Sequence, residues 1–287
     1  MGEDKPRTMT FLEHLQELRR RLWWGIVFVA LGIVVAYIFR HDLMVLMLEP
    51  FKEAWNQVRH QGGSLPEEPM IHYKNMAEPF FTDLKVAFLG GLYVGLPLLT
   101  TQIWLFVAPG LMPKEKRYAI PFLAFAYLFF SVGVVFCYVV VLPMAYQFFF
   151  KYAEGMNPGV AVNPTVMIND YVTFSMKLLA AFGGAFELPL FIAFLTLLRL
   201  VDWRQLIKYM RWAMLGTFVV GAMLTPPDPA SQLMMAVPLL ALYLLSICLS
   251  FLLWPRGHED RSPWKRKPKK KAKKKAKTTK KSGEKKS

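Results

Sequence analysis

Long apolar blocks separated by short charged segments dominate the pattern of this 287-residue sequence. Five of the blocks meet or approach the ~20 residues that a helix needs to cross a bilayer core of about 30 Å. They are Leu22–Phe39, Val86–Val107, Tyr118–Val141, Tyr171–Leu198 and Met234–Leu253. A sixth block, Trp212–Leu224, has only 13 residues, and the turn sequence at 225–229 separates it from the last block. The pattern predicts an all-α polytopic membrane protein with six transmembrane helices, the last two short and joined as a hairpin.

The Lys and Arg residues between these blocks predict the orientation of the chain. Residues 1–21 carry five, and the loops after the second and fourth blocks carry three and four. By contrast, the 142–170 loop carries only Lys151, the turn at 225–229 carries none, and the five in segment 40–85 are offset by seven acidic residues. Cytoplasmic loops are enriched in Lys and Arg, so both termini are predicted to face the cytoplasm.

The composition adds one feature, a strongly basic tail. The chain is 54% hydrophobic, its mean hydropathy is +0.30 and its net charge is +15. Residues 255–287 hold sixteen Lys and Arg against three acidic residues, so most of the net charge lies there. We expect a transmembrane domain over 1–254 and a disordered Lys-rich cytoplasmic tail over 255–287. Such a tail fixes topology and can bind anionic lipids, whereas no aromatic platform accompanies it to favour nucleic acid.

Two further patterns predict local packing. Leu43, Leu46, Met47 and Pro50 follow helical spacing within segment 41–80, which predicts a short amphipathic helix on the membrane surface. Gly91 and Gly95 form a small-xxx-small pair typical of closely packed helices.

A charged amphipathic segment precedes the first apolar block. Thr10 and Glu13 have the spacing of a capping box. Glu17 has Arg20 and Arg21 three and four residues after it, which favours an interfacial helix with internal ion pairs. The same carboxylate can instead be part of a binding site.

Three other acidic residues are candidates for function. Glu115 lies among basic residues in the loop after the second block, either as part of a turn and helix cap or as a carboxylate that binds an arginine. Glu187 lies deep in the fourth block, close to Pro189. Placing a charged acid at the bilayer centre costs at least ~2.5 kcal/mol, so its presence favours a functional role. Asp228 lies in the hairpin turn, where a helix N-cap is the simplest role, and Gln232 begins the last helix.

Enzymatic function is not supported. The sequence has no HExxH, GxSxG, P-loop or GxGxxG motif, and Cys137 and Cys248 lie in apolar blocks without metal-site spacing. We therefore predict no catalytic residues, no cofactor and no metal site. One function that the intramembrane acid allows is that of a proton-coupled small-solute transporter, with Glu187 as a relay.

Five strings of this sequence resemble the TatC family, in the family's order and spacing. They are His14–Arg21, Phe106–Gly110, Lys114–Arg117, Phe186–Pro189 and Leu224–Asp228. The resemblance spans roughly residues 8–254 and excludes the tail. It departs only slightly from the family, at Met112 and Pro113 before Lys114.

The resemblance implies a concave, glove-like bundle in the cytoplasmic (inner) membrane that recognises twin-arginine signal peptides of folded export substrates. It implies oligomers of the chain and partnership with the single-span proteins TatA and TatB, with the proton-motive force as energy source. Its implied site residues are Glu17, Arg19, Phe106 and Glu115 for the signal peptide, Glu187 as an intramembrane polar residue, Asp228 and Gln232 where TatA or TatB docks, and Pro50 in the periplasmic cap.

Overall fold

The computed structural model describes residues 11–63, 65–107, 119–155, 165–225 and 229–254. Contacts divide the chain after Leu253 into two units, and the first unit contains every described helix and strand. The predicted Lys-rich tail at 255–287 lies outside the described residues.

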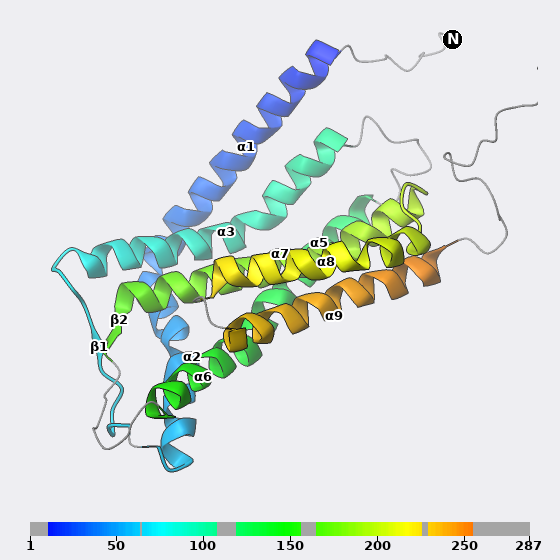
Figure 1. Ribbon diagram of the computed structural model, residues 1–287. Coiled ribbons are helices and arrows are strands. Elements are labelled where there is room, and N and C mark those ends of the chain that lie inside the picture. The colour runs from blue at the N-terminus through cyan, green and yellow to red at the C-terminus, as the bar shows by residue number, and fades with distance from the viewer. Residues whose placement is uncertain (1–10, 64, 108–118, 156–164, 226–228, 255–287) are drawn as a thin grey trace, which may run out of the picture. The chain divides into compact units, whose positions relative to one another are not determined.

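Helices account for nearly all of the described residues (Figure 1). In chain order they are α1 (Phe11–Ile38), α2 (Arg40–His60), α3 (Glu78–Val107), α5 (Ala119–Phe136), α6 (Leu142–Gly155), α7 (Ile168–Leu197), α8 (Trp203–Leu224) and α9 (Pro229–Leu253). A π-helical turn, η2 (Cys137–Val141), joins α5 directly to α6. Two short strands, β1 (Ile71–His72) and β2 (Val166–Met167), pair in parallel and bring the segments before α3 and α7 together.

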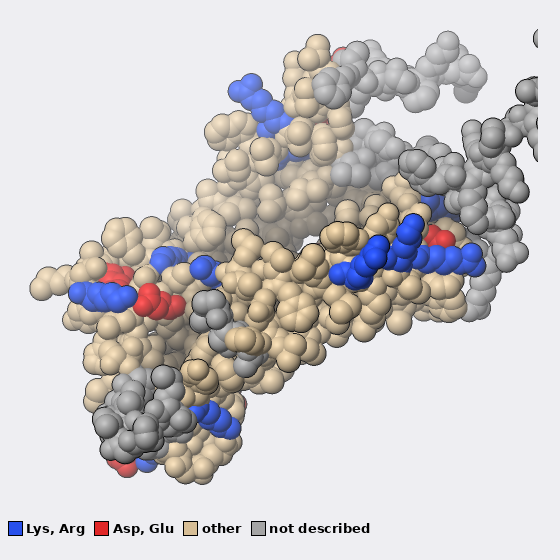
Figure 2. Space-filling model, in the orientation of Figure 1, with Lys and Arg blue, Asp and Glu red and all other residues tan. Residues whose placement is uncertain are grey.

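Five of the described helical stretches are long and apolar enough to cross a membrane, which confirms an all-α polytopic membrane protein. They are Leu12–Ile38, Glu78–Phe106, Pro121–Ala153, Ile168–Leu197 and Ser231–Leu253. Helix α8 is not among them, because its first half carries Arg204, Lys208 and Arg211. A sixth crossing and the orientation of the chain therefore remain predictions. Figure 2 shows charged side chains gathered mainly toward the ends of the helices, with largely uncharged surface between them.

Several helices extend beyond the apolar blocks that predict them. Helix α1 begins at Phe11, because the amphipathic segment continues without a break into the first block. Helix α8 has 22 residues and starts at a capping box in which Asp202 and Gln205 satisfy each other's backbone N–H groups. Helix α9 has 25 residues and starts at Pro229, a residue suited to the first helical turn. The predicted cap at Thr10 lies outside the described residues.

The predicted amphipathic helix exists as α2, but its apolar face packs on protein. Met47, Pro50, Phe51, Trp55 and Val58 are buried on α2, where it packs against α6. Phe51 has edge contacts with the rings of Tyr146, Phe150 and Tyr171, at centroid distances of 5.9, 5.6 and 5.3 Å. The helix is confirmed, and the aromatic side chains of α6 and α7 cover much of its apolar face. That α2 lies on the membrane surface stays a prediction.

Helices α1 and α3 lie side by side and antiparallel (Figure 1). A Cβ added to Gly91 would lie 2.4 Å from the backbone of Ile33, and one added to Gly95 would lie 3.1 Å from Val29 Cα. Small residues therefore let the two backbones approach. This confirms the close helix packing predicted from Gly91 and Gly95. It also fixes the register in which the N-terminal part of α1 meets the C-terminal part of α3.

Helices α5 and α9 both pack on α7. A Cβ on Gly183 of α7 would lie 2.6 Å from the Phe130 ring of α5. Near the C-terminal end of α7, the buried Thr196 hydroxyl donates to Ser250 of α9 at 2.9 Å. Helix α8 packs mainly on α9 and leaves most of its apolar side chains exposed.

Candidate functional site

One face of α1 carries a line of residues toward α3. His14, Glu17, Arg21 and Gly25 are spaced three or four residues apart, which places them on the same side of a helix. His14 contacts α3 at one end of this line, and Gly25 contacts Leu99 at the other. Glu17 and Arg21 therefore lie within the α1–α3 contact.

The rings of His14 and Phe106 close the end of that contact. Their centroids are 4.4 Å apart and their planes meet at 14°, which is a stacked arrangement. A stack of this kind contributes about 0.5–1.5 kcal/mol beyond the burial of its area. It holds the first turns of α1 against the last turns of α3, next to Glu17.

Glu17 is largely buried and forms an ion pair with Arg21. The distance from Arg21 Nη2 to Glu17 Oε1 is 3.2 Å, and the Glu17 and Arg21 side chains are 12% and 23% exposed. A carboxylate this far from water needs a charged or hydrogen-bonded partner. The structure thus confirms the internal ion pair predicted from spacing, and it selects Arg21 as the partner of Glu17.

Two polar atoms of this pair and one of Gln102 are buried and have no hydrogen-bond partner among the described residues. They are Glu17 Oε2, Arg21 Nε and Gln102 Oε1. Gln102 lies one helical turn before Phe106, on the side of α3 that faces α1. Each such atom costs about 1–3 kcal/mol of unmade hydrogen bonding. Buried unsatisfied groups in a native protein need an explanation, and a role in binding is one that fits two acceptors and a donor side by side.

The structure brings together only part of the predicted signal-peptide site. Glu17 and Phe106 lie at the same end of the α1–α3 contact. Arg19 is exposed and lies off the line of residues that faces α3. Glu115 lies outside the described residues, so its place relative to Glu17 stays a prediction.

Sequence reasoning did not identify His14 and Gln102 as members of this site. Both lie one turn before a predicted site residue, His14 before Glu17 and Gln102 before Phe106. Helical spacing from those two residues is the signal that would have found them.

Glu187 is half-buried near the middle of α7. It makes no ion pair with any residue that the structure describes. One turn earlier, Gly183 contacts Phe130 and so places this part of α7 against α5. Glu187 is an isolated acid within a membrane-spanning helix, and its predicted functional role is untested.

The residues predicted for the final hairpin are only partly described. Asp228 lies outside the described residues. The Gln232 amide donates to the carbonyl of Phe218 at 2.9 Å, which links α9 to α8. Gln232 therefore has a structural contact within the hairpin, and its predicted part in docking stays a prediction.

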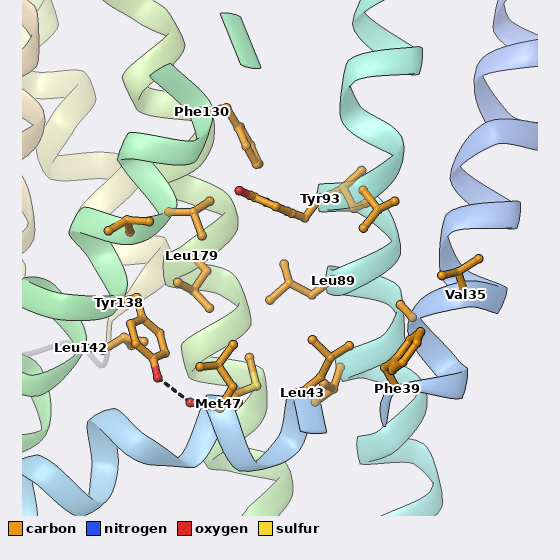
Figure 3. Close-up of a pocket in the computed structure, with 18 residues that line it drawn as sticks. Val35, Phe39, Leu43, Met47, Leu89, Tyr93, Phe130, Tyr138, Leu142 and Leu179 are labelled. Atoms are coloured by element: carbon orange, nitrogen blue, oxygen red, sulfur yellow. Dashed lines mark hydrogen bonds between the residues drawn. The ribbon is translucent and has the colours of Figure 1, made fainter. Parts of the chain in front are cut away.

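An apolar cavity of about 590 Å³ opens between α1, α2, α3, α5, η2 and α7 (Figure 3). Its lining is almost wholly hydrocarbon. The two hydroxyls in the lining are both engaged, since Tyr138 donates to the carbonyl of Leu46 at 2.7 Å and Tyr93 donates to Ser131 at 3.1 Å. Neither tyrosine hydroxyl has a free hydrogen to donate, so the cavity suits apolar groups rather than water.

The chain is similar to known translocase components over most of its length. A profile of the family described as Sec-independent protein translocase protein (TatC) matches residues 13–238. The TatC protein of Koribacter versatilis is 34% identical over 262 residues, which cover 91% of this chain and 92% of that protein. The TatC protein of Escherichia coli K12 is 32% identical over 243 residues, covering 85% and 88%.

Solved structures agree with the sequence matches. A crystal structure described as the twin-arginine translocase receptor TatC has a TM-score of 0.72 and is 30% identical, covering 84% of this chain and 99% of that chain. These similarities give no support to the alternative of a small-solute transporter. The helices, their packing and these relatives together show that the chain belongs to the TatC family.

Proposed function

We propose that this chain is the receptor and core component of a twin-arginine translocase. It binds twin-arginine signal peptides and exports folded proteins across the cytoplasmic membrane, driven by the proton-motive force. It makes and breaks no covalent bonds in this role. Both of its termini face the cytoplasm, which places the first turns of α1 where a precursor arrives.

The observation that carries the proposal is the Glu17 carboxylate held within the α1–α3 contact, beside the stacked His14 and Phe106. A carboxylate with little access to water binds a guanidinium through charge-assisted hydrogen bonds, which are about twice as strong as neutral ones. An ammonium lacks the planar fork of donors and replaces arginine poorly in such a site. Glu115 supplies the second carboxylate, and exposed Arg19 contributes at the rim.

The partners that we propose are TatA and TatB, the precursor's signal peptide and further copies of this chain. The hairpin of α8 and α9 is the docking region for TatA or TatB. Its support is the exposed apolar surface of α8 and the link from Gln232 of α9 to α8. Asp228 stands just before α9 in the sequence. The basic tail is proposed to contact anionic lipid.

Glu187 is the proposed point at which protons act on the transport cycle. Its support is its position in the middle of a membrane-spanning helix without an ion-pair partner among the described residues. If transport by the Glu187→Gln variant keeps the pH dependence of the parent chain, titration of Glu187 has no part in the mechanism.

Transport into membrane vesicles tests the function directly. Vesicles carrying this chain with its TatA and TatB partners would be given a folded reporter with an Arg-Arg or a Lys-Lys signal peptide. We expect uptake of the Arg-Arg reporter only, its loss with an uncoupler, and its loss in the Glu17→Gln variant. Glu49→Gln is the matched control, because Glu49 is an exposed acid paired with Lys52 on α2. Uptake that ignores the arginine pair would refute the proposal.

A further inference from the structure

Three polar atoms at the α1–α3 contact have no partner among the described residues, and two of them are acceptors that lack a donor. Glu17 Oε2 and Gln102 Oε1 are both acceptors, both buried, and both without a hydrogen-bond partner among the described residues. A guanidinium carries five N–H donors and no acceptor, so it is the side chain best suited to such a place.

These atoms share one short stretch of the helix pair. The contact of Gly25 with Leu99 lies on one side of it, and the stack of His14 on Phe106 lies on the other. Between these two contacts lie Glu17 and Arg21 on α1 and Gln102 on α3, each one helical turn from a residue of the interface. Their side chains therefore extend into the same interface.

The resident partner of Glu17 holds it by a single contact. Arg21 Nη2 reaches Oε1 at 3.2 Å, while neither Arg21 Nε nor Glu17 Oε2 has a hydrogen-bond partner in the described part of the chain. Arginine and carboxylate bind most strongly as a bidentate pair with two parallel hydrogen bonds. The Glu17–Arg21 pair lacks the second bond, which makes it a contact that another guanidinium can replace.

We propose that Arg21 is an internal competitor of the signal peptide. In the free protein its guanidinium pairs with Glu17. An arginine of the incoming peptide displaces it and also reaches the Glu17 and Gln102 oxygens that lack a donor among the described residues. This inference rests on the function proposed above and adds its regulation. Arg21 thereby lowers the apparent affinity of the site for every ligand.

Competition has a distinctive signature. Replacing Arg21 by a weaker competitor raises the affinity of every ligand for Glu17 by the same factor, because each ligand must break the same contact with Glu17 before it binds. It leaves the ratio between two ligands unchanged. A structural role for Arg21 predicts the opposite, namely weaker binding of all ligands once the pair is disturbed.

The test measures dissociation constants of the full chain in mild detergent for two labelled peptides, one with Arg-Arg and one with Lys-Lys. Arg21→Lys keeps a positive charge beside Glu17 and removes the planar fork. Arg21→Gln removes the competitor altogether, and thermal unfolding confirms that both variants are folded. Arg20→Lys is the matched control, because Arg20 is the exposed neighbour and makes no ion pair among the described residues.

We expect Arg21→Lys to bind both peptides about three- to tenfold more tightly, the scale of weakening one charge-assisted contact, with an unchanged ratio between them. Arg21→Gln is expected to bind at least as tightly as Arg21→Lys, and Arg20→Lys to match the parent chain. Unchanged or weaker Arg-Arg binding in folded Arg21→Lys would overturn the competitor role while leaving the receptor function intact. A parent chain that does not distinguish the two peptides would overturn both.

Discussion

The Tyr138 hydroxyl donates a hydrogen bond of 2.7 Å to the carbonyl of Leu46, across the gap between η2 and α2 (Figure 3). Leu46 lies four residues before Pro50, which is buried inside α2. Proline has no N–H, so the carbonyl four residues before it loses its helical donor. Tyr138 supplies that donor from another element, which explains how α2 continues through Pro50 and keeps its apolar face on α6.

This relationship predicts a coupling between Tyr138 and Pro50. Tyr138→Phe removes the donor and is expected to cost about 0.5–1.5 kcal/mol of stability in the parent chain. In a Pro50→Ala background the new N–H supplies the donor, so the same change is expected to cost less. Thermal unfolding of the four proteins in mild detergent measures the coupling.

Tyr152→Phe is the control for this cycle, because Tyr152 is 62% exposed on α6. It is expected to leave the unfolding temperature unchanged. An equal cost of Tyr138→Phe in both backgrounds would show that the hydroxyl does not replace the missing donor.

The contact of α1 with α3 predicts a strong effect of a single methyl group at Gly91. A Cβ there would lie 2.4 Å from backbone atoms of Ile33, which cannot rotate away. We expect Gly91→Ala to destabilise the protein by about 1–3 kcal/mol, as other overpacked contacts do. Gly184→Ala is the control, since a Cβ on Gly184 meets nothing within 4 Å. A similar unfolding temperature for the two variants would contradict the close approach.

Glu78 is predicted to stabilise the junction of α3 and α7. Its buried carboxylate accepts hydrogen bonds from the backbone N–H of Lys74 at 2.6 Å and of Asn169 at 3.3 Å. Glu78→Ala leaves both donors without this partner, and we expect a loss of about 1–3 kcal/mol in the free energy of unfolding.

A nearby exposed pair gives the contrast for Glu78. Asp170 is paired with Lys74 at 3.0 Å, with both side chains more than half exposed. Exposed ion pairs contribute about 0–1 kcal/mol, so Asp170→Asn is expected to have a small effect. The argument from burial fails if Asp170→Asn is as damaging as Glu78→Ala.

Gln102→Met is predicted to separate binding from stability. The Gln102 Oε1 atom is buried and has no hydrogen-bond partner where the structure describes the chain, so an apolar side chain of similar length removes an unsatisfied acceptor. We expect an unfolding temperature that is unchanged or higher, together with weaker binding of an Arg-Arg signal peptide. A clear loss of stability would instead give Gln102 a structural role.

Much of the fold follows from local sequence patterns. The five spans follow from runs of apolar residues, and the close packing of Gly91 and Gly95 follows from their spacing. The environment of α2 was harder to predict than the helix itself, because the residues that cover its apolar face lie on α6 and α7, far along the chain. Spacing also cannot say which side of a helix is met by protein and which by lipid.

The site was predictable to a smaller extent. The spacing of Glu17 allows an ion pair with Arg20 or Arg21, and only the packing of α1 on α3 selects Arg21. The unpaired atoms of Glu17, Arg21 and Gln102 are a property of tertiary structure, because burial and missing partners depend on both helices. Glu115 and Asp228 were singled out from sequence patterns and lie outside the described residues.

The central claim is that Glu17 lies in a site for the arginine pair of a signal peptide, and capture of a peptide tests it most directly. The purified chain in mild detergent would be incubated with immobilised Arg-Arg peptide and, separately, with the Lys-Lys version. We expect selective retention on the Arg-Arg peptide, with retention lost in Glu17→Gln and in Glu115→Ala and kept in Glu49→Gln. Equal retention on both peptides by the folded parent chain would contradict the account.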